Sequence, residues 1–484
     1  MGRFWLAGAE PDAGGSDGIC RVKDGDIHIE VVAPLTEWMV PVAGTPSVLV
    51  PRTEETDLVV HGSLPVQPGP VTLLGARTVK RSGLLTPLGG DAAELHRLRA
   101  DWCITGVHID GPETRFTGVR ARFTHLELWA RTGALQIAHR TAPPRQTTAT
   151  LEPGDAVETP FGAFGEDASL RVSSVGVMGS PGPWGVQIST YNWLQLDQIS
   201  GWTLDEALTR FIGPVQVLLT LLAGEECSVT HLELEIDGRW CAVYGHKVRP
   251  AATRPDSENL LLDSDAMPLD KVAAWCEMAN RLRPTPQVIS SAVSGDFATL
   301  EAEALALTTT AEGMDRVLYP NARRFDEDQV SKSIQALKNS DVPIEVSDAL
   351  TDALKIYFYE DSYPTRMRRL ADSLVEVAPR CVGRPNKWKQ EIASLRIGLA
   401  HALDGKSGST DDAIRKMHAQ VLSLRWAILL RLLLEAGVQA ETLAAAVDSS
   451  TRFRRDERAW HARLPKVFPD AGAESNEATS PSNS

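Results

Sequence analysis

The chain of 484 residues has few cysteines and arranges none of them in a known motif. Its six cysteines are scattered, with no CxxC pair among them. A zinc ribbon and a disulfide framework are therefore not indicated. Such usage is typical of reduced thiols in the cytosol.

Long apolar runs are also missing. The two most apolar stretches, residues 215–224 and 426–437, are shorter than the roughly 20 residues that a membrane span needs. The opening residues, MGRFWLAGAE, lack the apolar core of a secretory signal. The sequence therefore predicts a cytoplasmic protein without a membrane segment.

Motifs of several common enzyme chemistries are absent as well. The chain contains no GxxxxGK[ST] phosphate loop, no HExxH helix and no acidic cluster at a recognisable metal-binding spacing. No metal ion and no cofactor are therefore expected.

Negative charge is concentrated in the first part of the chain. The net charge is −14, and residues 1–285 carry 24 Lys and Arg against 35 Asp and Glu. That region should repel polyanions, so extended nonspecific nucleic-acid binding through it is not expected. The length itself predicts two or three domains.

Residues 1–285 are predicted to be rich in strands. The string GDIHIEVV alternates Ile27, Ile29 and Val31 with polar residues. The region forms either one unit or two β modules, of about residues 1–165 and 166–285.

The string THLEL occurs twice, at residues 124–128 and 230–234. Two strands with leucines facing a core explain it, and so do a His/Glu metal site or two related modules. Helices are expected at residues 203–224, where Thr203 and Glu206 form a capping box, and at residues 268–283.

From residue 286 onward the periodicity is helical. Helices are predicted at residues 296–318, 326–339, 345–360, 365–378, 386–404, 410–437 and 440–447. The predicted architecture is therefore α+β and multidomain, with an all-α domain over residues 286–466. TRFRRDER at 451–458 is expected to be a solvated terminus, and residues 467–484 a disordered tail.

The string RIGLAH, residues 396–401, places a cation and an imidazole on the predicted helix 386–404. The apolar residues of that helix fall in one stripe: Trp388, Ile392, Leu395, Leu399 and Leu403. His401 lies about 150° from the centre of this stripe. Gly398 permits close approach of another helix, so Gly398 and Ile397 are predicted to lie at a two-fold dimer interface.

Arg396 and His401 have the chemistry that metal-free RNA transesterification needs. A histidine can exchange protons with the ribose 2′-OH and the leaving oxygen, while an arginine neutralises the phosphate. A solvated helix face is the alternative explanation of the same spacing.

Nearby basic residues are candidates for RNA binding. They are Arg384, Lys387 and Lys389 before RIGLAH, and Arg366 with Tyr363 for stacking. Ordinary solvated helix charges explain these positions as well.

Several strings together resemble a known family. RxxxxH on a late helix resembles the HEPN superfamily, and GMDRVLYP (313–320) followed by RRF (323–325) resembles the start of its helical domain. GRFWLAG, VTLLGA and residues 101–129 are similar to the N-terminal domain of its ApeA-like branch.

The resemblance implies a metal-independent endoribonuclease of anti-phage defence that acts as a homodimer. Arg396 would bind the phosphate and His401 would act as general acid or base. The N-terminal region would sense a phage-derived trigger and control cleavage of cellular RNA in abortive infection.

One position departs from the pattern. Relatives commonly carry a polar residue after the arginine, whereas this chain has Ile397. A non-catalytic dimerisation or RNA-binding module is therefore the alternative. A carbohydrate-binding β domain is a third hypothesis, based on Trp5, Trp38, Trp102 and Trp129, although such tryptophans are usually core residues.

Overall fold

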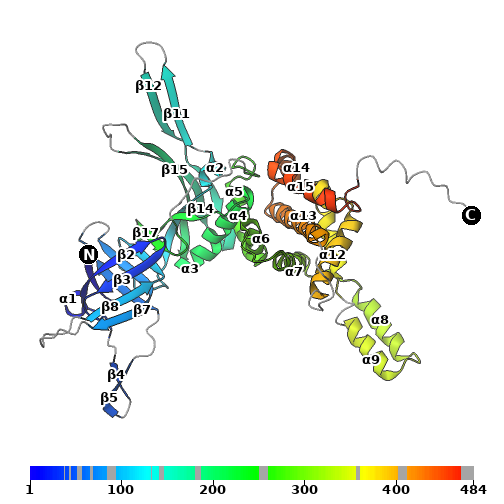
Figure 1. The fold of residues 1–484 in the computed structure, drawn as a ribbon, viewed down its shortest axis with the longest axis horizontal. Coiled ribbons are helices and arrows are strands. Elements are labelled where there is room, and N and C mark those ends of the chain that lie inside the picture. The colour runs from blue at the N-terminus through cyan, green and yellow to red at the C-terminus, as the bar shows by residue number, and fades with distance from the viewer. Residues whose placement is uncertain are drawn as a thin grey trace, which may run out of the picture. The chain divides into compact units, whose positions relative to one another are not determined.

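The computed structural model describes residues 1–36, 39–42, 45–51, 57–65, 69–83, 94–131, 133–140, 146–179, 187–249, 260–355, 360–401 and 411–469. The chain divides into two compact units. The first comprises Met1–Leu219, Cys227–Glu258 and Pro268–Cys276, and the second Thr220–Glu226, Asn259–Met267 and Glu277–Ser484. Strands dominate the first and helices the second, which confirms the predicted α+β architecture (Figure 1).

The first unit is built on a sheet of 13 strands, in the order β13-β14-β15-β10-β16-β17-β9-β7-β6-β1-β2-β3-β8. Their bounds are β1 Gly2–Leu6, β2 Ser16–Lys23, β3 Asp26–Val31, β6 Leu58–Ser63, β7 Pro70–Gly83, β8 Glu94–Ala100, β9 Trp102–Thr105, β10 Phe116–Phe123, β13 Val157–Phe161, β14 Ala168–Met178, β15 Ile188–Trp202, β16 Val229–Ile236 and β17 Arg239–Gly245. Strand β7 also pairs with β8, so β7, β6, β1, β2, β3 and β8 close into a ring.

The core of this ring follows the alternation seen in the sequence. Ile27, Ile29 and Val31 of β3 are fully buried, as predicted, and pack in one cluster with Phe4 and Leu73. Short elements flank the sheet: helices α1 (Pro11–Gly14) and α2 (Leu126–Ala130), the pair β4 (Met39–Val42) and β5 (Thr45–Pro51), and the pair β11 (Gly133–Arg140) and β12 (Gln146–Pro153).

The two THLEL strings adopt different structures. The first forms a turn that leads into α2, whereas the second lies inside β16. Leu126, Leu232 and Leu234 are buried in both settings. The repeated string therefore does not mark a repeated structural unit.

The helical segment after β15 begins as predicted. Thr203 caps α3 (Leu204–Ala207) in a capping box with Glu206, a π-helical turn (η2, Leu208–Ile212) follows, and α4 (Gly213–Ala223) ends at Gly224 with φ of 78°. Helix α5 covers Leu269–Arg281.

Among the described residues, two helical stretches are long and apolar enough to cross a membrane. They are Leu204–Ala223 and Asp411–Glu435, in which 67% and 72% of an apolar 18-residue window is buried in the protein. Core helices pass the same test, so these stretches are weak evidence for a membrane segment.

The second unit contains α6 (Thr285–Ser294), α7 (Leu300–Leu318), α8 (Glu327–Lys338), α9 (Ile344–Ala353), α10 (Tyr363–Asp372), α11 (Pro379–Val382), α12 (Pro385–His401), α13 (Asp411–Glu435), α14 (Ala440–Ser449) and α15 (Thr451–Arg463). Helix α13 is buried on almost all sides from Ala419 to Leu433 and forms the centre of the unit.

Two predictions for this unit were wrong. Helix α15 is no solvated terminus, because Phe453, Asp456 and Trp460 are buried. The beginning of the predicted tail is also packed, since Val467 and Phe468 are 0% and 5% exposed. Residues 470–484, the rest of that predicted tail, lie outside the described residues. Helix α6 was not predicted, although Pro286 in its first turn is typical of a helix start.

Candidate functional site

The first three residues of the stripe predicted on helix α12 are buried, and the fourth, Leu399, is half-buried. Trp388 and Ile392 are fully buried and Leu395 is 6% exposed. The indole of Trp388 donates a hydrogen bond to Ser423 Oγ at 2.8 Å, which fixes α12 against α13. Leu403 lies outside the described residues.

Arg396 leaves this helix beside the buried stripe and meets two other helices. Its guanidinium forms an ion pair with Glu312 of α7. The same guanidinium lies 4.4 Å from the ring centroid of Tyr363, the first residue of α10. The Arg396 side chain is 35% exposed, so it is held by the fold and still reaches solvent.

The hydroxyl of Tyr363 is buried and has no hydrogen-bond partner in the described part of the chain. Burial raises the pKa of Tyr363, and the charge of Arg396 opposes this rise only partly. The tyrosine is therefore a neutral, fixed platform for the Arg396 guanidinium.

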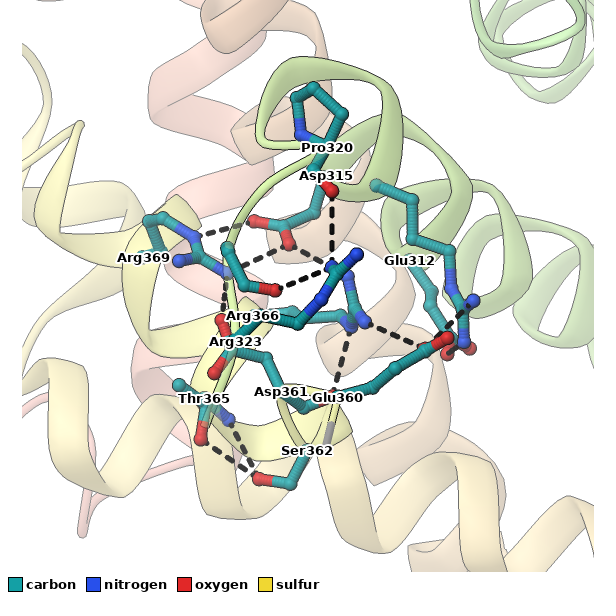
Figure 2. Close-up of polar contacts among 12 residues, drawn as sticks. Glu312, Asp315, Pro320, Arg323, Glu360, Asp361, Ser362, Thr365, Arg366 and Arg369 are labelled. Carbon is teal, nitrogen blue, oxygen red and sulfur yellow. Dashed lines mark hydrogen bonds and ion pairs between the residues drawn. The ribbon is translucent and has the colours of Figure 1, made fainter. Parts of the chain in front are cut away.

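A cluster of ion pairs joins α7 and α10, and it is drawn in Figure 2. Asp315 is only 4% exposed at its side chain and accepts from Arg366 Nη1 at 3.3 Å, Arg369 Nε at 2.9 Å and Arg369 Nη2 at 3.0 Å. Arg369 also donates to Asp361 at 2.8 Å. Hydrogen bonds to these carboxylates raise the pKa of Arg369. We call these four residues the Asp315 cluster.

The Asp315 cluster connects to Arg396 through alternating charges. Arg366 Nη2 lies 3.2 Å from Glu360 Oε2, and Arg316 bridges Glu360 at 2.9 Å and Glu312 at 3.2 Å. Because Glu312 holds Arg396, α7 and α10 set the position of the motif arginine. These carboxylates were not predicted from the sequence. Among them, Asp315 lies inside the string GMDRVLYP that resembles the start of the helical domain.

The other predicted RNA-binding residues are placed separately. Arg384 and Lys387 are exposed at the start of α12 and Lys389 is half-buried, two to three helical turns before Arg396. Arg366 is instead buried, with its guanidinium between Asp315 and Glu360. In this structure Arg366 holds α10 against α7.

His401 is the last residue of α12, and its side chain lies outside the described part of the structure. Its pairing with Arg396 therefore stays a prediction. Ile397 is 59% exposed. Among the described residues, and apart from its chain neighbours and the backbone of α12 itself, no atom lies within 4 Å of the position that a Cβ on Gly398 would take. This part of α12 presents an open face beside Arg396.

Within the described residues, no group of three or more His, Cys, Asp or Glu side chains is arranged to hold a metal ion. A His/Glu metal site, the less favoured explanation of the THLEL strings, is not supported by any such cluster there.

Comparison with known proteins identifies the N-terminal region. The family model of the ApeA N-terminal domain 1 matches residues 1–263. The match covers more than half of the 484 residues, so the chain belongs to this family. No curated protein and no solved structure matches. Family membership indicates an ApeA-type protein of anti-phage defence, and the match ends before the helices that carry Arg396.

Proposed function

We propose that the protein is an endoribonuclease in which the helical unit is a HEPN domain and Arg396 and His401 form a metal-independent active site. The observation that carries the proposal is the placement of Arg396, five residues before His401, by Glu312 and Tyr363 at a solvent-accessible position. Family membership supports the context of anti-phage defence.

The geometry of Arg396 is compatible with phosphate binding. A guanidinium has five N–H donors in one plane. Glu312 engages Nη1, and the guanidinium carbon lies over the Tyr363 ring. Within the described residues the guanidinium makes no further hydrogen bond, so the ion pair would orient the arginine and leave donors for a phosphate.

The reaction would be an attack of the ribose 2′-OH on the adjacent phosphorus. A bond forms between O2′ and phosphorus, and the bond from phosphorus to O5′ breaks. A base takes the 2′-OH proton and an acid protonates O5′, which are the roles assigned to His401. Arg396 would stabilise the charge on the phosphoryl oxygens. The products are a 2′,3′-cyclic phosphate and a 5′-OH.

A homodimer would complete the site. The open face at Ile397 and Gly398 lets α12 of two protomers approach closely. Two Arg396/His401 pairs would then share one cleft. Arg384, Lys387 and Lys389 would contact the RNA backbone along the same helix. The phage-derived trigger would act on the N-terminal unit, in the cytoplasm.

The test compares variants of the motif with an exposed arginine outside it. Arg396→Ala and His401→Ala are compared with Arg415→Ala, whose side chain is exposed on α13. Purified from phage-infected cells, so that the trigger has acted, wild type and R415A should release RNA fragments with 2′,3′-cyclic phosphate ends in the presence of EDTA. Equal cleavage by R396A and H401A would refute the catalytic assignment.

Ile397 favours a second candidate, a non-catalytic dimerisation or RNA-binding module. It places an exposed apolar side chain where relatives carry a polar one. A dimer that is purified from phage-infected cells, binds RNA and releases no fragments with 2′,3′-cyclic phosphate ends would favour this function.

A further inference from the structure

A second polar site lies in the helical unit and shares no residue with the surroundings of Arg396. It is a cavity of about 180 Å³ lined by Gly224, Val293, Arg425, Trp426, Leu429, Arg452, Arg455 and Asp456. Three of these residues are arginines and one is a carboxylate. We call it the arginine cavity.

Arg452 is a half-buried cation of this cavity, and its Nη1 is the buried end. Its Nη2 donates to the carbonyl oxygen of Leu221 at 2.9 Å, and its guanidinium lies 4.7 Å from the ring centroid of Trp426. Its Nη1 is buried and has no hydrogen-bond partner within the described residues. Burial, reinforced by the positive charge of Arg425, lowers the pKa of Arg452 to about 10. A buried cationic donor without an acceptor is costly.

Gly224 keeps the space for this guanidinium. Its φ is +78°, and a Cβ at this position would lie 1.8 Å from Arg452 Nη1. A side chain here would be strained by this backbone conformation, and the Arg452 guanidinium would have to move to make room for it. Glycine at this turn therefore leaves the guanidinium in its place.

Positive charge exceeds negative charge among the lining residues. Asp456 accepts from Trp426 Nε1 at 2.9 Å and lies 3.6 Å from Arg425 Nη2 and 3.1 Å from Arg455 Nε. Its oxygens are therefore already engaged by other groups. Glu303 lies outside the lining, 3.8 Å from Arg425, and burial raises its pKa. An anion would supply the acceptor that Arg452 Nη1 lacks.

We propose that the arginine cavity binds the phosphate group of a small ligand, either inorganic phosphate or a mononucleotide. Guanidinium groups match phosphate oxygens in geometry and charge. A water molecule takes about 30 Å³ in the liquid, so the cavity of about 180 Å³ has room for a tetrahedral oxyanion. The bound phosphate would join α6, α13, α15 and the turn at Gly224, and so stabilise the helical unit.

The test measures binding of inorganic phosphate, AMP and adenosine to the purified full-length protein. Calorimetry gives the affinities and thermal unfolding the stabilisation, both at constant ionic strength. Arg455→Gln removes an exposed lining arginine, and Arg452→Gln removes the half-buried one. Arg454→Gln is the matched control, because Arg454 is exposed on the same helix and donates to the carbonyl oxygens of Ser449 and Ser450.

Wild type and R454Q should bind phosphate and AMP but not adenosine. Binding should weaken about tenfold or more in R455Q and be lost in R452Q. If AMP binds more tightly than inorganic phosphate, the ligand is a nucleotide. If the two affinities are equal, the cavity recognises the phosphate group alone. Absence of binding to wild type, or equal affinities of R455Q and R454Q, would overturn the proposal. The comparison of R455Q with R454Q tests the proposal even if R452Q does not fold. None of these binding measurements depends on RNA cleavage.

Discussion

Neutralising Asp315 should destabilise the helical unit by about 3 kcal/mol. The Asp315 and Arg366 side chains are both 4% exposed, and Asp315 also accepts two hydrogen bonds from Arg369. Removing one partner of a buried ion pair costs about 3–5 kcal/mol, because the remaining charge stays buried. Asp315→Asn keeps one carbonyl acceptor, so the lower end of this range applies.

The matched control is Asp372→Asn on α10. Asp372 also pairs with an arginine, at 2.7 Å from Arg368, but its side chain is 48% exposed. Exposed pairs four residues apart on a helix contribute only about 0.3–0.5 kcal/mol. The same chemical change should therefore have very different effects at the two positions.

Hydrogen exchange of peptides from α7 and α10 measures the free energy of opening these helices separately from the sheet unit. A loss of about 3 kcal/mol accelerates exchange from the open state roughly 100-fold or more. D372N should exchange within a few-fold of wild type. If D315N exchanged at the rate of D372N, the buried ion pairs of the Asp315 cluster would not stabilise α7 and α10 as argued.

Three further outcomes are expected. Glu166→Gln should lower the free energy of unfolding of the sheet unit, measured in urea, by about 1–3 kcal/mol. Burial alone would raise the pKa of Glu166, but hydrogen bonds from Ser200 and Trp202 outweigh burial and lower the pKa. The single oxygen of the Gln amide cannot accept all of these hydrogen bonds. Phe468→Ala should cost about 3–4 kcal/mol, because the ring is 5% exposed; no change in thermal stability would place it outside the core. Partial desolvation and the positive charge of Arg425 lower the pKa of His418, although this residue stays exposed. Below about pH 6.5 the unfolded chain therefore binds more protons, and stability falls as the pH falls. The melting temperature of His418→Gln should depend less on pH across this range.

Periodicity in the sequence predicted the elements whose one face is buried. The stripe of α12 and the alternation of β3 both follow from local spacing, and Thr203 with Glu206 identified a helix start. Helix α15 has the same kind of signal, since Phe453 and Trp460 lie seven residues apart and face the core. The prediction there gave more weight to the six charges of TRFRRDER than to this spacing.

Long-range partners could not be predicted in the same way. Arg396 was identified from its motif, but the carboxylate that holds it is 84 residues away in the chain. The two THLEL strings show the same limit, because identical residues form a turn and helix in one place and a strand in the other. Which structure such a string adopts depends on the strands available to pair with it.

Ile397 bears on both candidate functions, because it lies where a second helix could pack. A single exposed apolar residue on a protein surface needs no explanation. Here it is 59% exposed, and it adjoins a glycine with open space around it on the helix that ends in the motif histidine. These two residues form a small, smooth patch that suits contact with a second helix. Catalytic and non-catalytic modules would both use that contact, so the oligomeric state cannot separate them. Only the chemical ends of the RNA that the protein releases can, because a 2′,3′-cyclic phosphate requires the proton transfers assigned to His401.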